Sequence, residues 1–194
     1  MRKWKRVHGV DGPRYRSALA AHEAELLCSL VRSLLEMLED RQSSAPVDEL
    51  AEITGIRTGN SVPPQDDTMK RLLPDLYRPV ADDPAGSDAG ESLNSALRGL
   101  HEPDIIDAKH QAAQRLLDTI PADGGKFELT EGDAQAWACA VNDVRLALGT
   151  MLDIGADGPD RLPEDHPMAG HLDVYQWLTV LQEYLVLCLV SGSR

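Results

Sequence analysis

The stretch Glu23–Glu39, EAELLCSLVRSLLEMLE, decides the fold class of this 194-residue chain. Leu27, Val31 and Leu34 recur at steps of four and three residues, which places their side chains on one face of a helix. Further leucines widen that face to the width that packing on a globular core requires. The pattern predicts a first long helix over residues 20–41 and a mainly α fold.

Residues 130–191 predict two more long helices. Thr130 is a helix N-cap candidate, with an acidic residue in the turn that follows it. The last helix is expected over His171–Val190, and its turns from Tyr184 onward are apolar on nearly every side. Such a helix is either central in the fold or covered by a second copy in a homodimer.

Between these helices, residues 42–125 predict short helices and proline-rich loops. Residues 41–103 hold seven of the 12 prolines of the chain. Residues 82–90 are acidic and rich in Gly, Ala and Pro, and they predict a mobile loop. Short helices fit between the breaks at residues 47–54, 66–73, 92–100 and 105–120.

Residues 1–19 predict a small N-terminal β-hairpin. Apolar and polar side chains alternate on both sides of Asp11-Gly12-Pro13, which is turn chemistry. Residues 126–130 are a candidate third strand, since a two-stranded hairpin is marginal alone. The whole pattern predicts a single domain over residues 1–194, a helical bundle of about six helices with this hairpin.

Charge is distributed unevenly along the chain. The chain holds 19 Lys and Arg against 32 Asp and Glu, a net charge of −13, which disfavours non-specific binding of the whole surface to nucleic acid. The first 16 residues nevertheless carry an excess of cations. The favoured interpretation is a solvated hairpin that balances the acidic body, and the alternative is a contact arm for a partner. Its candidate contact residues are Arg2, Lys3, Trp4, Lys5, Arg6, Arg14 and Arg16.

Motifs for catalysis, metal binding and phosphate binding are absent from the sequence. It contains no His-Glu-x-x-His, no glycine-rich phosphate loop and no Gly-x-Ser-x-Gly elbow, so we assign no catalytic, cofactor or metal residues. The apolar stretch Val174–Val190 is too short and too polar to span a bilayer comfortably, and no secretory signal is expected. These features favour a cytoplasmic protein.

Two further sets of residues have both a structural and a functional interpretation. Asn142, Asp143 and Arg145 form a polar cluster inside a predicted helix, which favours an arginine paired with a carboxylate across a helix interface. The alternative is a contact with a partner or an anion. The three cysteines are isolated in the sequence, and inert packing is the expected state of Cys28, Cys139 and Cys188.

An ordered set of segments resembles a known family. The set includes MRKWKRV at the start, RLLPDLYR from Arg71, NDVRLALGT from Asn142 and YQWLT from Tyr175. It is similar to an actinobacterial family of domains of unknown function, whose genes commonly lie beside that of the Clp protease adaptor. The resemblance implies no known enzyme activity. Some members are described as oxidation-responsive transcription regulators with a Cys-x-x-x-Cys sensor, a pair that this sequence lacks.

The expected function is that of a non-enzymatic regulatory protein, acting in transcription or stress response through protein contacts. The candidate partners are a sigma factor, the polymerase or a Clp component, and direct sequence-specific DNA binding is disfavoured because only the hairpin is basic. One alternative is a proteostasis factor that works with the Clp adaptor or protease. Another is an enzyme whose site is not recognised.

Overall fold

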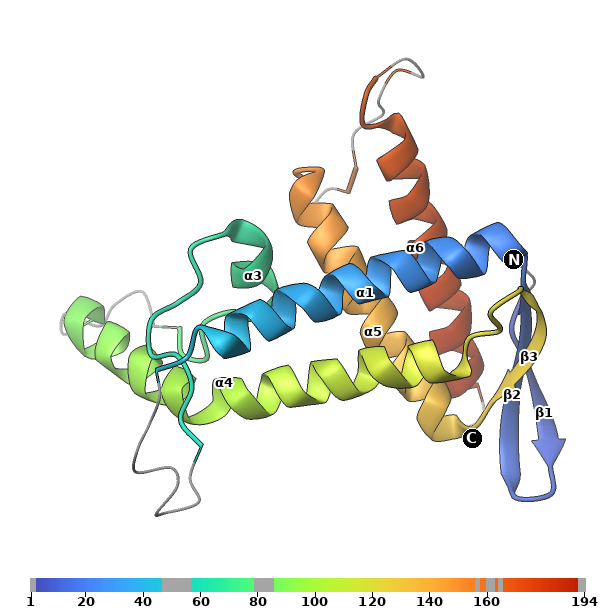
Figure 1. Cartoon of the computed structure of the whole chain (residues 1–194), viewed down its shortest axis with the longest axis horizontal. Coiled ribbons are helices and arrows are strands. Elements are labelled where there is room, and N and C mark those ends of the chain that lie inside the picture. Colours follow the sequence, from blue (N-terminus) through green and yellow to red (C-terminus); the bar gives the residue numbers. More distant parts are fainter. Residues whose placement is uncertain are drawn as a thin grey trace. The chain divides into compact units, whose positions relative to one another are not determined.

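The computed structural model describes residues 3–46, 57–78, 86–155, 158–159, 163 and 166–191. Within that part of the chain the fold is mainly α, as predicted, with five helices and one three-stranded sheet (Figure 1). In chain order the elements are β1 Lys5–Gly9, β2 Gly12–Leu19, α1 Ala21–Ser43, α3 Asp67–Leu72, α4 Gly86–Thr119, β3 Gly125–Leu129, α5 Glu131–Met151 and α6 Ala169–Val190.

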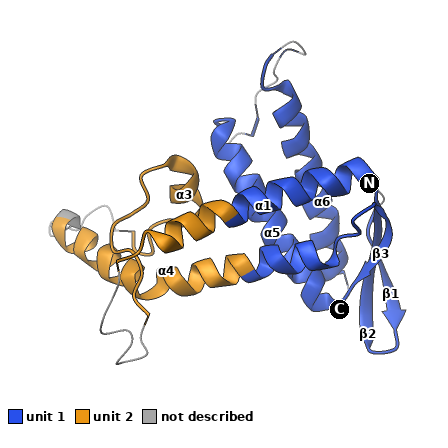
Figure 2. Cartoon of the chain, in the orientation of Figure 1, with its two compact units in different colours: residues 1–35, 111–194 blue, residues 36–110 orange. Residues whose placement is uncertain are grey.

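The contacts divide the chain into two compact units (Figure 2). Unit 1 comprises residues 1–35 and 111–194, and unit 2 comprises residues 36–110. The boundary therefore passes through α1 and through α4. The single domain over residues 1–194 stays a prediction, and each unit is described by itself below.

Unit 1 is built on an antiparallel sheet with the strand order β1-β2-β3. A two-residue turn joins β1 to β2, since Gly9 and Gly12 are cross-strand partners. The hairpin prediction is confirmed and extended, because β3 is the third strand that residues 126–130 suggested. Gly124, just before β3, lies so close to the backbone of Ala21 that a Cβ there would come within 2.6 Å of its nitrogen. A glycine is therefore required where the chain enters β3.

Two long helices pack on this sheet in unit 1. The helix α5 lies along α6 and contacts β2 and β3, while α6 contacts β1 (Figure 1). The predicted N-cap of α5 is confirmed: the Asp133 amide donates to Thr130 Oγ1, and the Asp133 carboxylate accepts from the Thr130 amide. The largest fully buried side chains of this unit are Tyr15, Leu27, Val31, Leu34, Leu116, Leu129, Trp137, Val141, Leu178, Leu181 and Leu185.

Unit 2 contains α3 and parts of α1 and α4. Asp66 caps α3 by accepting a hydrogen bond from the Met69 amide at 2.8 Å. The predicted helix over 66–73 is thus confirmed, with the bounds of α3. The buried apolar side chains of unit 2 are Leu38, Met69, Leu72, Leu73 and Ile106.

The prediction of two short helices at 92–100 and 105–120 is wrong, because α4 is one helix that runs through Pro103. Proline has no amide proton to donate to the carbonyl four residues earlier, and that loss normally breaks a helix. Here the Gly59 amide donates to the Gly99 carbonyl at 2.7 Å in its place. The proline ring also fits against Gly59, where a Cβ would lie 2.8 Å from its Cδ.

This continuous helix also corrects two related expectations. The loop expected over residues 82–90 is helical from Gly86, so residues 86–90 were predicted wrongly, and residues 82–85 lie outside the described chain. The helix expected over 47–54 also lies outside it. The bundle of about six helices is therefore five helices among the described residues.

Candidate functional site

The register of the sheet sorts its side chains onto two faces. Cross-strand partners project to the same side, and neighbours along a strand to opposite sides. Lys5 pairs with Arg16, which pairs with Glu128, and Arg14 pairs with Val7. Together with Ala18 and its partner Lys126, these side chains form the face turned away from the core. We call this the outer sheet face, made of Lys5, Val7, Arg14, Arg16, Ala18, Lys126 and Glu128.

The outer sheet face carries four cations and one carboxylate, a net charge of +3 on a chain whose total is −13. Arg16 holds that carboxylate: its Nε donates to Glu128 Oε1 at 2.8 Å, and its Nη2 contacts the same oxygen. Arg14 Nη2 lies 3.8 Å from Asp11 Oδ2, which is a weak ion pair. No ion pair within the described residues involves Lys5 or Lys126. Cations are therefore available on this face.

The inner sheet face packs against the core through aromatic side chains. Trp4, 7% exposed, meets Phe127 and Trp137 edge to face, with ring centroids 5.5 and 5.8 Å away. Phe127 stacks on Trp137 at 5.1 Å, and the Trp137 indole donates to Thr119 Oγ1 at 2.8 Å. Such ring pairs stabilise beyond their burial, so this aromatic cluster holds the sheet against α5.

The candidate contact residues of the arm are thus divided by the fold. Lys5, Arg14 and Arg16 share the outer sheet face, while Trp4 lies in the core. Lys3 Nζ lies 5.1 Å from the centre of the Tyr184 ring on α6. Arg6 is on the inner side of β1, where it partly offsets the rise that burial causes in the pKa of the Cys188 thiol of α6. Arg2 lies outside the described residues.

Sequence reasoning missed Lys126 and Glu128. Both are on β3, far from the arm along the chain, and only the pairing of β2 with β3 brings them beside Ala18 and Arg16. The alternation of residues 126–130 was the available signal. It predicted a strand, but it held no information on which residues of β2 would lie opposite.

The three cysteines are free thiols in different surroundings. Cys139 is exposed, whereas Cys28 and Cys188 are half-buried. Burial raises the pKa of the Cys28 thiol, and Arg32 offsets this only in part. Burial likewise raises the pKa of Cys188 against the opposing effects of the Arg6 amide and charge. A raised pKa reduces the thiolate fraction, so neither half-buried thiol is activated in this state.

The polar cluster of α5 is an arginine–amide contact. Arg145 Nη1 donates to Gln182 Oε1 on α6, and the guanidinium lies 5.5 Å from the centre of the Tyr175 ring. The expected partner was a carboxylate. Asp143 is buried and has a partner, and Asn142 is half-buried. The contacts of Arg145 therefore join α5 to α6 inside unit 1.

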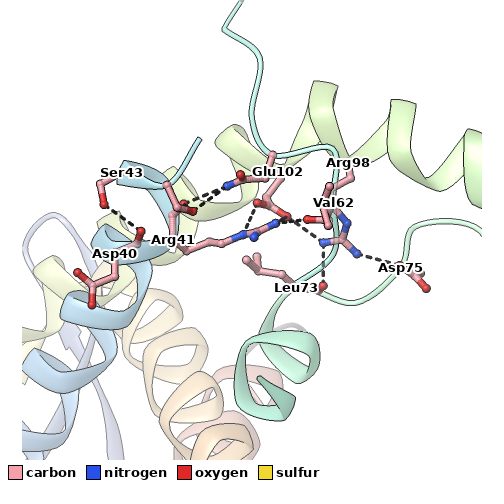
Figure 3. Close-up of polar contacts among 10 residues, drawn as sticks. Asp40, Arg41, Ser43, Val62, Leu73, Asp75, Arg98 and Glu102 are labelled. Carbon is pink, nitrogen blue, oxygen red and sulfur yellow. Dashed lines mark hydrogen bonds and ion pairs between the residues drawn. The ribbon is translucent and has the colours of Figure 1, made fainter. Parts of the chain in front are cut away.

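Unit 2 contains a buried ion cluster that the sequence did not suggest (Figure 3). Arg41 and Arg98 both donate to the Glu102 carboxylate, at 2.8 Å each. Arg41 also donates to the Val62 carbonyl, and Arg98 to the Leu73 carbonyl and to Asp75. Because both guanidinium groups hold backbone carbonyls, the cluster fixes the segment around α3 onto α1 and α4.

Other features of the described residues offer little chemistry. An open cavity of about 600 Å³ in unit 2 lies beside Arg98 and Asp75, and the described residues that line it include neither a histidine nor a cysteine. No three His, Cys, Asp or Glu side chains in the described ranges are grouped to hold a metal ion. None of the helices seen in these ranges has the length and apolar character that crossing a membrane requires.

Comparison with known proteins gives close relatives along the whole chain. Proteins named oxidative stress regulator AosR, from Mycobacterium bovis and Mycobacterium tuberculosis, are 62% identical over 197 residues, covering 100% of this chain and 90% of theirs. A Mycobacterium leprae protein named putative oxidative stress regulator AosR is 58% identical over 194 residues, covering 98% of this chain and 89% of its own. No solved structure matches the chain.

The family model for a domain of unknown function, DUF2017, matches residues 1–189. This match and the mycobacterial relatives confirm the resemblance to an actinobacterial family of domains of unknown function, with members named oxidative stress regulators. The chain therefore belongs to the DUF2017 family.

Proposed function

We propose that this protein is a stress-responsive, non-enzymatic regulator that acts through a protein contact made by the outer sheet face. The names of its relatives support the regulatory role. The observation that carries the contact is the gathering of Lys5, Arg14, Arg16 and Lys126 on one sheet face of an acidic chain, where all but the half-buried Arg14 are exposed.

The distribution of the remaining cations favours a protein partner over direct base readout. Base readout needs an element with cationic or amide side chains that enters a groove. The helix α6 contains no Lys or Arg, and Arg145, the one cation of α5, is engaged with Gln182. Regulation through a partner therefore fits the chain better than a protein that reads DNA by itself.

A charge-matched pair of variants tests this function in the native cells. One variant replaces Lys5, Arg14, Arg16 and Lys126 by Ser. The control replaces four exposed cations outside the sheet, Arg32, Lys70, Arg71 and Arg78. Each change removes four positive charges, so the two proteins carry the same net charge.

We expect the outer-face variant to accumulate normally but to lose the transcriptional response to oxidant, while the control keeps it. Transcript levels before and after peroxide, at matched protein levels, are the measurement. A normal response in the outer-face variant would contradict the proposal.

A further inference from the structure

We propose that the outer sheet face binds an acidic polypeptide segment of a partner. In the free protein, Glu128 pairs with Arg16 as an internal substitute for one carboxylate of that segment, which displaces it on binding. This inference rests on the proposed function and adds to it the chemistry of the partner and the contact that the partner displaces.

The first argument is the contact that Arg16 already makes. Two nitrogens of its guanidinium reach one carboxylate oxygen of Glu128. Arginine is suited to this planar recognition of carboxylates. A Glu or Asp side chain of a partner would offer Arg16 the same group that it holds in the free protein.

The second argument is that the Arg16–Glu128 pair is exposed. The side chains are 51% and 42% exposed, and exposed ion pairs contribute little because water solvates both charges. Exchange of Glu128 for a carboxylate of the partner therefore costs little. Lys5, beside Arg16 in the register, makes no ion pair within the described part of the chain and would gain a counter-ion from the partner.

The third argument separates an acidic polypeptide from other polyanions. The face is small, with four cations on three short strands, and the rest of the chain is strongly acidic. Nucleic acids and anionic membranes extend beyond such a face and would meet the acidic body. A short acidic segment can keep its charges within the face, because screening limits the repulsion to about 8–10 Å. A second copy of the chain is itself acidic and is repelled as a whole.

The test uses the full-length protein and a fluorescent peptide of alternating Glu and Ser, with fluorescence anisotropy at low and at physiological salt. We expect salt-sensitive binding that weakens about tenfold in Arg16→Ala. Glu128→Gln should bind about three-fold more tightly, since it removes the negative charge that competes for Arg16. Asp123→Asn is the matched control, because it removes one exposed carboxylate, just before β3, that makes no ion pair with Arg16, and it should change the affinity less.

Other outcomes would overturn the inference in distinct ways. If Glu128→Gln binds as the wild type does while Arg16→Ala weakens binding, Glu128 is not the internal substitute. If a 12-base-pair DNA duplex or a vesicle with 30% phosphatidylserine binds more tightly than the peptide, with the same dependence on Arg16, the partner class is wrong. An Arg16-dependent doubling of mass in light scattering would assign the face to a second copy.

The cellular experiment separates this inference from the proposed function. If the outer-face variant loses the oxidant response but no acidic peptide binds, the proposed function stands and the acidic partner is wrong. If the peptide binds as expected but the oxidant response is intact, the surface binds acidic segments and the proposed function is wrong.

Discussion

At the scale of single residues, Asp133 stabilises unit 1 through two contacts. Its carboxylate accepts hydrogen bonds from Thr130 at the start of α5 and from Arg115 on α4. Burial alone would raise the pKa of Asp133, but these hydrogen bonds outweigh it and lower the pKa below its ordinary value. A lowered pKa means that the ionised carboxylate stabilises the folded state.

The lowered pKa of Asp133 predicts how the stability lost in Asp133→Asn depends on pH. The stabilisation is present above the unfolded pKa, about 3.9 for Asp, and is lost as the pH falls through the lower folded value. At pH 7 we expect the variant to be about 1 kcal/mol less stable than the wild type in urea unfolding. The difference in the free energy of unfolding between the variant and the wild type should shrink progressively below about pH 4. A difference in stability that is unchanged at low pH would contradict this account of the carboxylate.

Trp4 shows why the arm could not be interpreted fully from sequence. Its place between cations suggested a contact residue, whereas the fold buries it between Phe127 and Trp137. We expect Trp4→Ala to lower the free energy of unfolding by about 3 kcal/mol, because it leaves a cavity in this cluster. Trp4→Phe, which keeps a ring, should cost less than half as much. Equal losses in chemical denaturation would argue against the ring packing.

At the scale of elements, α6 presents one buried face and one exposed face. Leu185 is fully buried, whereas Leu187 is 53% exposed. The sequence offered two alternatives for this helix, central burial or a homodimer, and among the described residues only one face of it is covered. The homodimer stays a prediction.

Two glutamate variants of α6 separate its faces. We expect Leu187→Glu to fold with a stability within about 0.5 kcal/mol of the wild type, since the side chain is exposed. Leu185→Glu should not fold, because it buries an unpaired charge. Circular dichroism on heating is the measurement. Unfolding of Leu187→Glu would place that residue in a core, and a smaller mass in light scattering would place it in a homodimer.

The ion cluster of unit 2 is an element-scale feature with its own test. Replacing Glu102 by Gln leaves Arg41 and Arg98 without their shared carboxylate in a buried place. We expect a loss of about 3 kcal/mol in the free energy of unfolding. Asp75→Asn is the control, because Asp75 is mostly exposed and should cost less than about 1 kcal/mol. A similar cost for both would mean that the cluster does not depend on burial.

Local patterns predicted α1, α5, α6 and the strands, because apolar periodicity and cap residues act over a few positions. The continuity of α4 could not be predicted in this way. It depends on the Gly59 amide, which reaches the Gly99 carbonyl from a distant segment. The same limit applies to the outer sheet face: the arm supplied Lys5, Arg14 and Arg16, but the register of β3 was needed to add Lys126 and Glu128.

At the scale of the whole molecule, net charge determines which classes of partner the protein attracts or repels. A net charge of −13 repels a polyanion, and the positive outer sheet face attracts one only at short range. We therefore expect no sequence preference in a DNA-shift assay with the purified protein near physiological salt. A tight shift that survives competitor DNA would instead identify the sheet as a DNA-reading element.

The central claim is that the outer sheet face is the contact surface for an acidic partner segment. The most direct measurement compares peptide affinity among the wild type, the variant lacking Lys5, Arg14, Arg16 and Lys126, and the control lacking four cations elsewhere. We predict that the control binds the acidic peptide like the wild type, while the outer-face variant does not bind measurably. Equal affinities of the two variants would contradict the claim, because binding would then follow net charge and not this surface.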